Sequence, residues 1–350
     1  MARLLDVARA AGVSRSTVSN VFSRPERVSP EIRRRVEAAA ERLGYGGPDP
    51  TGRALRGGKV NAIGFLPGLS LEGSFHWPYF IEFLAGVAGE CGARHAGLLL
   101  LSGIDEEAAT RGVSGSLVDG FILHNAGYVD QLIALASKRR TPFVAVDMAA
   151  PPSITSIRID NKGGGRQSVE HALALGHRKF AILSLALPER ERRSPVYHAP
   201  MVRPRRLAET FPDTLERYAG YADALAAAGI AIDAVPVVEA LPDSTEGAAL
   251  LLDRAPEATM VLAMADDLAL SVYAEAGKRG RSVPRDLSVI GFDDVPAAAA
   301  AAPPLTTIAQ PTREKGRMAA QMIFEPPAEP LHIVMPVHLV VRGSTAPPAR

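Results

Sequence analysis

The sequence predicts an all-α helix-turn-helix headpiece followed by an α/β body of two lobes. Residues 4–46 contain three short segments with helical spacing and helix-capping signals. From residue 60 onward, short apolar runs alternate with amphipathic stretches of about 10 to 15 residues, as in parallel sheets covered by helices. The chain has 350 residues, 47% of them hydrophobic, which is enough for a large core beyond the headpiece. We divide it into a headpiece (1–46), a linker (47–59) and a core (60–345).

The first two helices of the headpiece are defined by their turn and their cap. Apolar residues recur at helical spacing between Leu4 and Ala11, and Gly12 permits a sharp turn. Ser14 stands where an N-cap satisfies the free amides of a following helix. The pattern therefore predicts a second helix that begins near Arg15.

The exposed start of this second helix is the predicted contact with DNA. Val18, Val21 and Phe22 recur at i, i+3 and i+4 and are expected to face a small core. The polar side chains left outside stand where a recognition helix meets base edges in a major groove. They are Ser14, Arg15, Ser16, Thr17 and Asn20. The alternative is an ordinary surface hairpin whose arginines only keep it soluble.

The third helix and the linker complete the basic part of the chain. Ser29 as cap, Pro30 at the first position and Gly44 after the last turn predict the third helix. The Gly- and Pro-rich linker could form about one and a half helical turns at 51–56, ordered only against DNA or a partner copy. Residues 1–59 hold 12 Lys and Arg against 6 Asp and Glu, so this part alone is basic enough for phosphates. Double-stranded operator DNA is the predicted partner.

Composition and missing motifs exclude other classes of function. No apolar run approaches the roughly 20 residues of a membrane span, and the N-terminus lacks a signal-peptide core, so a cytoplasmic protein is expected. The single cysteine, Cys91, is expected in the core. The sequence has no GxxxxGK[ST], GxGxxG, GxSxG or HExxH motif. We therefore expect a protein that is not an enzyme, without cofactor or metal.

Polar residues at strand ends are the candidate ligand contacts. In open parallel sheets, ligands bind beyond the carboxyl ends of the strands. His124, Asp147, Asp266 and Asp293 each follow an apolar run. The alternative for each acid is a cap that satisfies loop amides, and Asp267 and Asp294 are expected to be solvated neighbours. The runs are 62–66, 98–101, 120–123, 143–146, 180–183, 260–264 and 289–292.

An aromatic patch follows the first of these runs. Phe75 and Trp77 could line the mouth of a sugar site, because aromatic faces cover the apolar face of a pyranose. The segment Tyr79 to Leu84 is interpreted mostly as the core side of a helix. For the aromatic patch, the contact with a sugar and the packing in the core both remain possible interpretations.

Several blocks, in order, resemble one family. They are the headpiece LLDVARAAGVSRSTVSNVFSRPERVSPEIRRRVEAAAERLGYG (4–46) with its linker, IGFL (63–66), VDGFIL (118–123), TPFVAVD (141–147), VEHALALGHRK (169–179), RYAGY (217–221), VPRDLSVIGFDD (283–294) and PLTTI (304–308). The chain is thus similar to the lactose-repressor (LacI/GalR) family of bacterial transcription regulators, over nearly its whole length.

The resemblance implies a body like periplasmic sugar-binding proteins and a specific set of contacts. Effector contacts map onto Asp147, Arg217, Asp293 and Gln310. In the linker, Leu55 matches the leucine that enters the minor groove, and Arg53 is assigned to DNA with it. The implied protein is a homodimeric repressor released from a near-palindromic operator by a sugar or sugar derivative. A corepressor acting in the opposite sense is the alternative, and the lack of a C-terminal leucine heptad favours a dimer over a tetramer.

Two departures from the family pattern concern the effector. Ala265 stands where the family often has Asn or Ser, so one usual polar contact is missing. The stretch 188–212 inserts six arginines among prolines, in a connection longer than expected. It is either a solvated loop or a flap that favours an anionic ligand.

Overall fold

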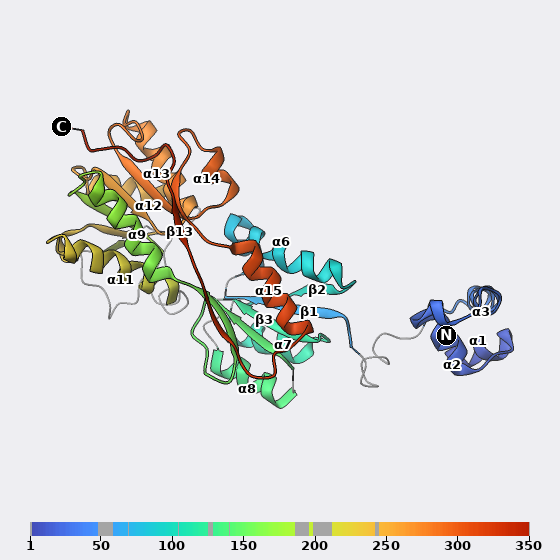
Figure 1. Cartoon of the computed structure of the whole chain (residues 1–350). Coiled ribbons are helices and arrows are strands. Elements are labelled where there is room, and N and C mark those ends of the chain that lie inside the picture. Colours follow the sequence, from blue (N-terminus) through green and yellow to red (C-terminus); the bar gives the residue numbers. More distant parts are fainter. Residues whose placement is uncertain are drawn as a thin grey trace. The chain divides into compact units, whose positions relative to one another are not determined.

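The computed structural model describes most of the chain as two compact units, Met1–Val60 and Asn61–Arg350 (Figure 1). The described residues are 2–47, 59–68, 70–103, 105–124, 129–139, 141–185, 196–198, 212–241 and 245–349. Two of the residues predicted to contact DNA, Arg53 and Leu55, lie outside these ranges, as does most of the arginine-rich stretch 188–212.

The first unit contains the three predicted helices, α1 (Leu4–Ala11), α2 (Arg15–Ser23) and α3 (Pro30–Arg42), with one 3-10 turn at Pro25–Arg27. Gly12 follows α1 with a φ of 60°, in the left-handed region that glycine adopts without steric cost. The Oγ of Ser14 accepts a hydrogen bond from the Thr17 amide at 3.1 Å, so the predicted cap is confirmed. Val7, Val18 and Val36, one from each helix, are fully buried together.

The second unit contains two sheets, each forming one lobe. The first sheet has strand order β12-β5-β4-β3-β1-β2, and all of its neighbouring strands are parallel. Its strands are β1 (Ala62–Pro67), β2 (Gly97–Leu100), β3 (Gly120–His124), β4 (Phe143–Val146), β5 (Thr155–Ile159) and β12 (His332–Met335). The predicted runs at 62–66, 98–101, 120–123 and 143–146 are thus confirmed as strands.

The second sheet has strand order β13-β11-β10-β9-β6-β8-β7 and is parallel except for the pair β11 and β13. Its strands are β6 (Phe180–Ser184), β7 (Val196–His198), β8 (Val237–Glu239), β9 (Met260–Ala263), β10 (Ser288–Asp293), β11 (Thr306–Ala309) and β13 (His338–Val340). The three predicted runs at 180–183, 260–264 and 289–292 lie at the centre of this sheet.

Helices cover both faces of each sheet, because successive strand side chains point to opposite faces. On the first sheet, Phe65 packs with α6 and α15, whereas Leu66 packs with α7 and α8. On the second sheet, Ile182 packs with α9 and α11, whereas Leu183 packs with α12, α13 and α14. The bounds of these helices, and of the short helix that precedes α6, are α5 (Leu71–His76), α6 (Pro78–Ala93), α7 (Glu106–Gly115), α8 (Val129–Arg139), α9 (Asn161–Ala174), α11 (Pro212–Ala227), α12 (Thr245–Arg254), α13 (Asp266–Lys278), α14 (Pro296–Ala300) and α15 (Thr312–Phe324).

Two helix pairs approach closely through glycine. A Cβ on Gly316 of α15 would lie 2.2 Å from the carbonyl oxygen of Phe83 in α6, and one on Gly165 of α9 would lie 2.4 Å from that of Arg217 in α11. Neither backbone could move away without separating its helices, so any larger residue would force them apart. Figure 1 shows both pairs side by side. The glycines therefore fix where Lys315 and Arg217 lie.

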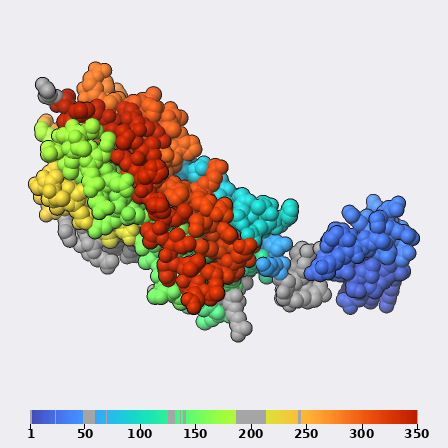
Figure 2. All heavy atoms as spheres, in the orientation of Figure 1, coloured from blue at the N-terminus to red at the C-terminus, as the bar shows by residue number. Residues whose placement is uncertain are grey.

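The chain passes between the two lobes three times, after β5, after β11 and after β12. In Figure 2 the C-terminal residues, in red, extend along the body over both lobes. Cys91 is buried in the core of the first lobe, as predicted. Among the described residues, no helix has the length and apolarity needed to cross a membrane.

Candidate functional site

The predicted DNA-contacting residues lie together at the start of α2. Arg15 and Ser16 are exposed, and Thr17 and Asn20 are partly exposed, while Val18 and Val21 point into the core of the headpiece. Ser14 also lies 2.7 Å from the Ser16 hydroxyl and 2.8 Å from the Thr17 hydroxyl. The helix thus presents a short polar edge whose hydroxyls are already ordered by the cap.

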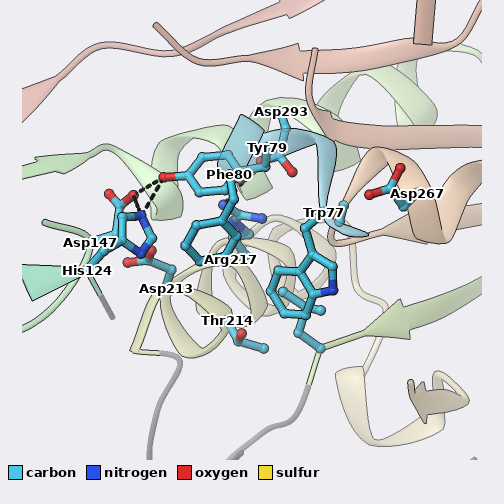
Figure 3. Close-up of a pocket in the computed structure, with 12 residues that line it drawn as sticks. Trp77, Tyr79, Phe80, His124, Asp147, Asp213, Thr214, Arg217, Asp267 and Asp293 are labelled. Atoms are coloured by element: carbon cyan, nitrogen blue, oxygen red, sulfur yellow. Dashed lines mark hydrogen bonds and ion pairs between the residues drawn. The ribbon is translucent and has the colours of Figure 1, made fainter. Parts of the chain in front are cut away.

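A pocket lies where side chains of both lobes meet (Figure 3). It contains about 530 Å³ of empty space, part of it open to solvent. The first lobe contributes residues of α6 and the ends of β3 and β4, and the second contributes residues of α11, α13 and β10. The lining residues are Trp77, Tyr79, Phe80, His124, Asp147, Leu185, Asp213, Thr214, Arg217, Ala265, Asp267 and Asp293.

Arg217 is held rigidly in the second lobe. Its Nε donates to Asn161 Oδ1 at 2.8 Å, and its Nη1 donates to the carbonyl of Met264. Its guanidinium lies 3.6 Å from the centroid of the Phe292 ring, a cation–π contact. Its Nη2 lies 3.6 Å from Asp293 Oδ1. An arginine fixed on three sides can offer its remaining donors to a hydroxyl pair or carboxylate at little further entropic cost.

Asp147 is the centre of a buried cluster in the first lobe. It accepts hydrogen bonds from the Tyr79 hydroxyl and from the ammonium group of Lys315, and its Oδ2 lies 3.3 Å from His124 Nε2. The Tyr79 hydroxyl lies 2.9 Å from the same His124 nitrogen, as the dashed lines in Figure 3 show. Lys315 is fully buried. A buried lysine is retained only where it is paired, and here it neutralises the aspartate.

Gln310 connects the two clusters. Its side-chain amide donates to Asp293 Oδ1 at 2.6 Å, and its Oε1 accepts from Lys315 at 2.8 Å. It stands between β11 and α15, where the chain passes from the second lobe to the first. A continuous polar chain therefore runs from Asp147 through Lys315, Gln310 and Asp293 to Arg217, across both lobes.

Burial sets the protonation of the site. Burial opposes the charge of Asp147, but Lys315 and His124 outweigh it and hold the pKa of Asp147 well below its usual range. Burial lowers the pKa of His124, so this imidazole is neutral near pH 7. Burial raises the pKa of Asp293 to about 6, although Arg217 and Gln310 oppose the shift. Burial and the charge of Asp147 raise the pKa of Asp213 to about 8.

Two aspartates of the site have left-handed backbones. Asp147 has a φ of 51° and Asp293 a φ of 113°. Such conformations are costly for residues other than glycine and persist where the surroundings enforce them. Both side chains line the pocket between the lobes.

The polar residues that the sequence predicts as ligand contacts do not all have the same role in the structure. Asp147, Asp293 and His124 line the pocket, and Gln310 supports it. Asp266 does not line it: its Oδ1 accepts from the Thr307 hydroxyl at 2.5 Å and its Oδ2 accepts from the Val295 amide at 2.9 Å. Asp266 thus has the alternative role of a strand-end cap, whereas Asp267, expected to be only a solvated neighbour, lines the pocket in its place.

The aromatic residues that line the pocket also differ from those predicted. Trp77 lines the pocket as predicted, but Phe75 is 51% exposed and does not. Tyr79 and Phe80, interpreted mostly as core, line it as well, because α6 begins at Pro78 and its first turn faces the second lobe. Tyr79 packs against the cores of both lobes.

Five polar residues of the site were missed in the sequence: Tyr79, Asn161, Asp213, Thr214 and Lys315. One of them carries a signal that could have been used. Lys315 lies on the helix face that also bears Thr312, Gly316 and Ala319, all buried, and a charge among small buried positions indicates a partner inside. Among the described residues, no group of three or more His, Cys, Asp or Glu side chains is placed to hold a metal ion.

The comparisons with known proteins agree with this architecture. Residues 3–47 match "Bacterial regulatory proteins, lacI family" and residues 169–345 match "Periplasmic binding protein-like domain". An HTH-type transcriptional regulator of Mycobacterium tuberculosis is 38% identical over 99% of this chain and 98% of its own length.

Two solved structures show the same fold over the whole chain. The lac repressor dimer bound to operator and the anti-inducer ONPF is 25% identical with a TM-score of 0.76, covering 99% of both chains. The complex of the transcriptional regulator CelR with cellobiose is 29% identical with a TM-score of 0.68, covering 98% of this chain and 100% of that one. The resemblance seen in the sequence is thus confirmed, and this chain belongs to the lacI family of bacterial transcriptional regulators, with a periplasmic-binding-protein-like ligand-binding body.

Proposed function

We propose that this protein is a cytoplasmic, dimeric repressor that binds a near-palindromic operator and is released by a small sugar-like effector. The observation that carries the proposal is the convergence of Asp147, Asp293 and Arg217, from two lobes, on one pocket beside aromatic faces. Such a site recognises hydroxyl groups by charge-assisted hydrogen bonds and covers the apolar face of a sugar ring with Trp77. The related structure that holds cellobiose supports a sugar.

The mechanism follows from the polar chain between the lobes. A ligand that touches Arg217 and Asp147 bonds to both lobes at once and so favours one spacing between them. In the proposed dimer, that spacing sets the distance between two linkers and hence between two headpieces. The linker contacts proposed for Arg53 and Leu55 would transmit the change to DNA. The ligand can shift the equilibrium only by its difference in affinity for the two states.

The experiment that tests this function is an operator titration with and without ligand. The operator is obtained by selection from random DNA, and ligands are found by the rise in melting temperature that hexoses and disaccharides cause. We expect a stabilising ligand to weaken operator binding at least about fivefold. Tighter binding would show a corepressor instead, and unchanged operator affinity with every stabilising ligand would contradict control by effector.

The headpiece assignment is tested by Asn20→Ala. Because Asn20 is placed to reach a base edge, the variant is expected to lose about 1–3 kcal/mol of specific operator affinity and to keep its affinity for random DNA. Both are measured by fluorescence anisotropy at one fixed salt concentration. Glu41→Ala, at an exposed site near the end of α3, is the control. An equal loss on operator and random DNA would show that Asn20 contacts only the backbone.

A further inference from the structure

Two buried oxygens in the pocket have no hydrogen-bond partner among the described residues. Asp213 and Thr214 form the first turn of α11 and line the pocket, and they are only 8% and 1% exposed. Asp213 Oδ1 and Thr214 Oγ1 have no hydrogen-bond partner in the part of the chain that the structure describes. A buried polar atom left unbonded costs stability, so both oxygens are available to form hydrogen bonds with a ligand in the pocket.

The cations that face Asp213 in the described part of the chain are each paired with another carboxylate. Asp147 is paired with Lys315, and Asp293 lies beside Arg217. Arg158, which also faces Asp213, is paired with Glu216, and His124 is neutral. Among the described groups that face Asp213, the cations Lys315, Arg217 and Arg158 are thus each engaged by another carboxylate. An ionised Asp213 would be the one carboxylate of this set without an ion pair.

An uncharged ligand and a cationic ligand would interact differently with Asp213. A hydroxyl can bond to Asp213, but it does not neutralise the ionised form of this buried side chain, which is costly to keep charged. An ammonium group supplies both the charge and donors for the Asp213 and Thr214 oxygens. The Trp77 and Phe80 rings border the same space (Figure 3), and aromatic faces also favour a cation.

We propose that the effector is a hydroxylated ligand bearing a protonated amino group, which pairs with Asp213 and Thr214 while Arg217 and Asp293 hold its hydroxyl groups. This inference rests on the proposed function of the same pocket. It concerns the class of effector and leaves the control of DNA binding unchanged.

The pH dependence follows from the state of Asp213 in the free protein. Burial raises the pKa of Asp213 to about 8, so below pH 7 the free carboxyl is mostly protonated. Pairing with an ammonium group requires the carboxylate, and binding therefore releases a proton. Affinity for an amine is expected to fall as the pH falls, by up to about tenfold between pH 7 and pH 6. The affinity for a neutral ligand needs no such release.

The test uses matched amines and alcohols with the full-length protein. Glucosamine, galactosamine and mannosamine are compared with glucose, galactose and mannose by calorimetry at pH 7 and pH 6. We expect at least one amine to bind at least about tenfold more tightly than its parent hexose. Asp213→Asn should remove that advantage and the pH dependence, and leave the affinity for the hexose within about threefold.

Asp223→Asn is the matched control, because Asp223 lies on the same helix α11 but outside this pocket, 59% exposed and 2.7 Å from Lys162. It should keep the preference for the amine. An equal loss in Asp223→Asn, an amine preference that survives Asp213→Asn, or a panel in which no amine binds better than its hexose would each overturn the inference. Hexose binding that controls operator affinity would then leave the proposed function standing, so the two failures are distinguishable.

Discussion

Lys315→Met is expected to lower the free energy of unfolding by about 3–5 kcal/mol, the largest effect of any single substitution considered for this protein. The ammonium of Lys315 is fully buried and bonds to Asp147 and Gln310. Methionine has a similar length, so the substitution leaves little cavity but removes the charge that balances a buried carboxylate. Urea unfolding of the parent and the variant at one protein concentration measures the loss.

Two further variants separate the charge from the packing. Lys315→Met combined with Asp147→Asn removes both charges and should cost less than the sum of the single substitutions, by more than about 1 kcal/mol. Arg317→Met is the control on the same helix, since Arg317 pairs with Glu314 at the surface, 42% and 46% exposed. It should cost less than about 1 kcal/mol. Additive losses in the double variant would show that the Lys315–Asp147 pair is not coupled.

Lys315→Met should also reverse the contribution of Asp147 to the pH dependence of the free energy of unfolding. In the parent, the pKa of Asp147 lies below its usual range, so its stabilisation is present above the unfolded pKa and is lost as the pH falls. Without Lys315, burial dominates and raises the pKa of Asp147. The folded variant then binds a proton more readily than the unfolded chain, and its deficit relative to the parent should shrink between pH 7 and pH 5. A deficit that stays constant would exclude this explanation.

Arg217→Ala is expected to weaken effector binding by about 2–5 kcal/mol and thereby abolish the response of operator binding to the effector. The guanidinium is pre-positioned by Asn161, Met264 and Phe292, and alanine leaves Asp293 without its cation. Operator affinity without ligand should stay within about threefold of the parent, because the substitution lies in the ligand-binding body. Calorimetry and operator anisotropy measure the two quantities.

A second variant, Arg217→Lys, distinguishes the loss of the effector contact from a failure of the protein to fold. It keeps the positive charge but cannot make the forked contacts, so it should fold and still lose most of the response. Arg166→Ala removes an exposed arginine of α9, 60% exposed and 3.7 Å from Glu170, and should change neither quantity. A normal response in both Arg217 variants would remove this residue from the effector site.

The headpiece and the central strands could be predicted because their signals are local. The Ser14 cap, the glycine at position 12 and the apolar spacing of α2 each depend on neighbours a few residues away. Six of the seven predicted runs form inner strands, which are apolar because parallel strands are buried on both faces, whereas the run at 98–101 forms the edge strand β2. The strands β7 and β8 are short, with three residues each, and β5 contains the polar residues Thr155, Ser156 and Arg158, so all three carry weaker signals.

The candidate site was predicted only where a residue ends a strand or matches a family block. Asp147, Asp293 and His124 were found in this way. Lys315 and Tyr79 were not, since their role depends on α15 packing beside α6, over 200 residues apart in sequence. Asp266 and Asp267 are adjacent, and the direction of the first turn of α13, which decides between cap and pocket, is a tertiary property.

Control of DNA binding by the effector can be tested by measuring the affinity of the protein for its effector with and without saturating operator. If one ligand in the cleft controls DNA binding, thermodynamic linkage requires the operator to weaken effector binding by the same factor by which the effector weakens operator binding. We expect the two factors to agree, at about fivefold or more, in the parent. Effector affinity that is the same on and off the operator would contradict the account, because the pocket and the headpiece would then be uncoupled.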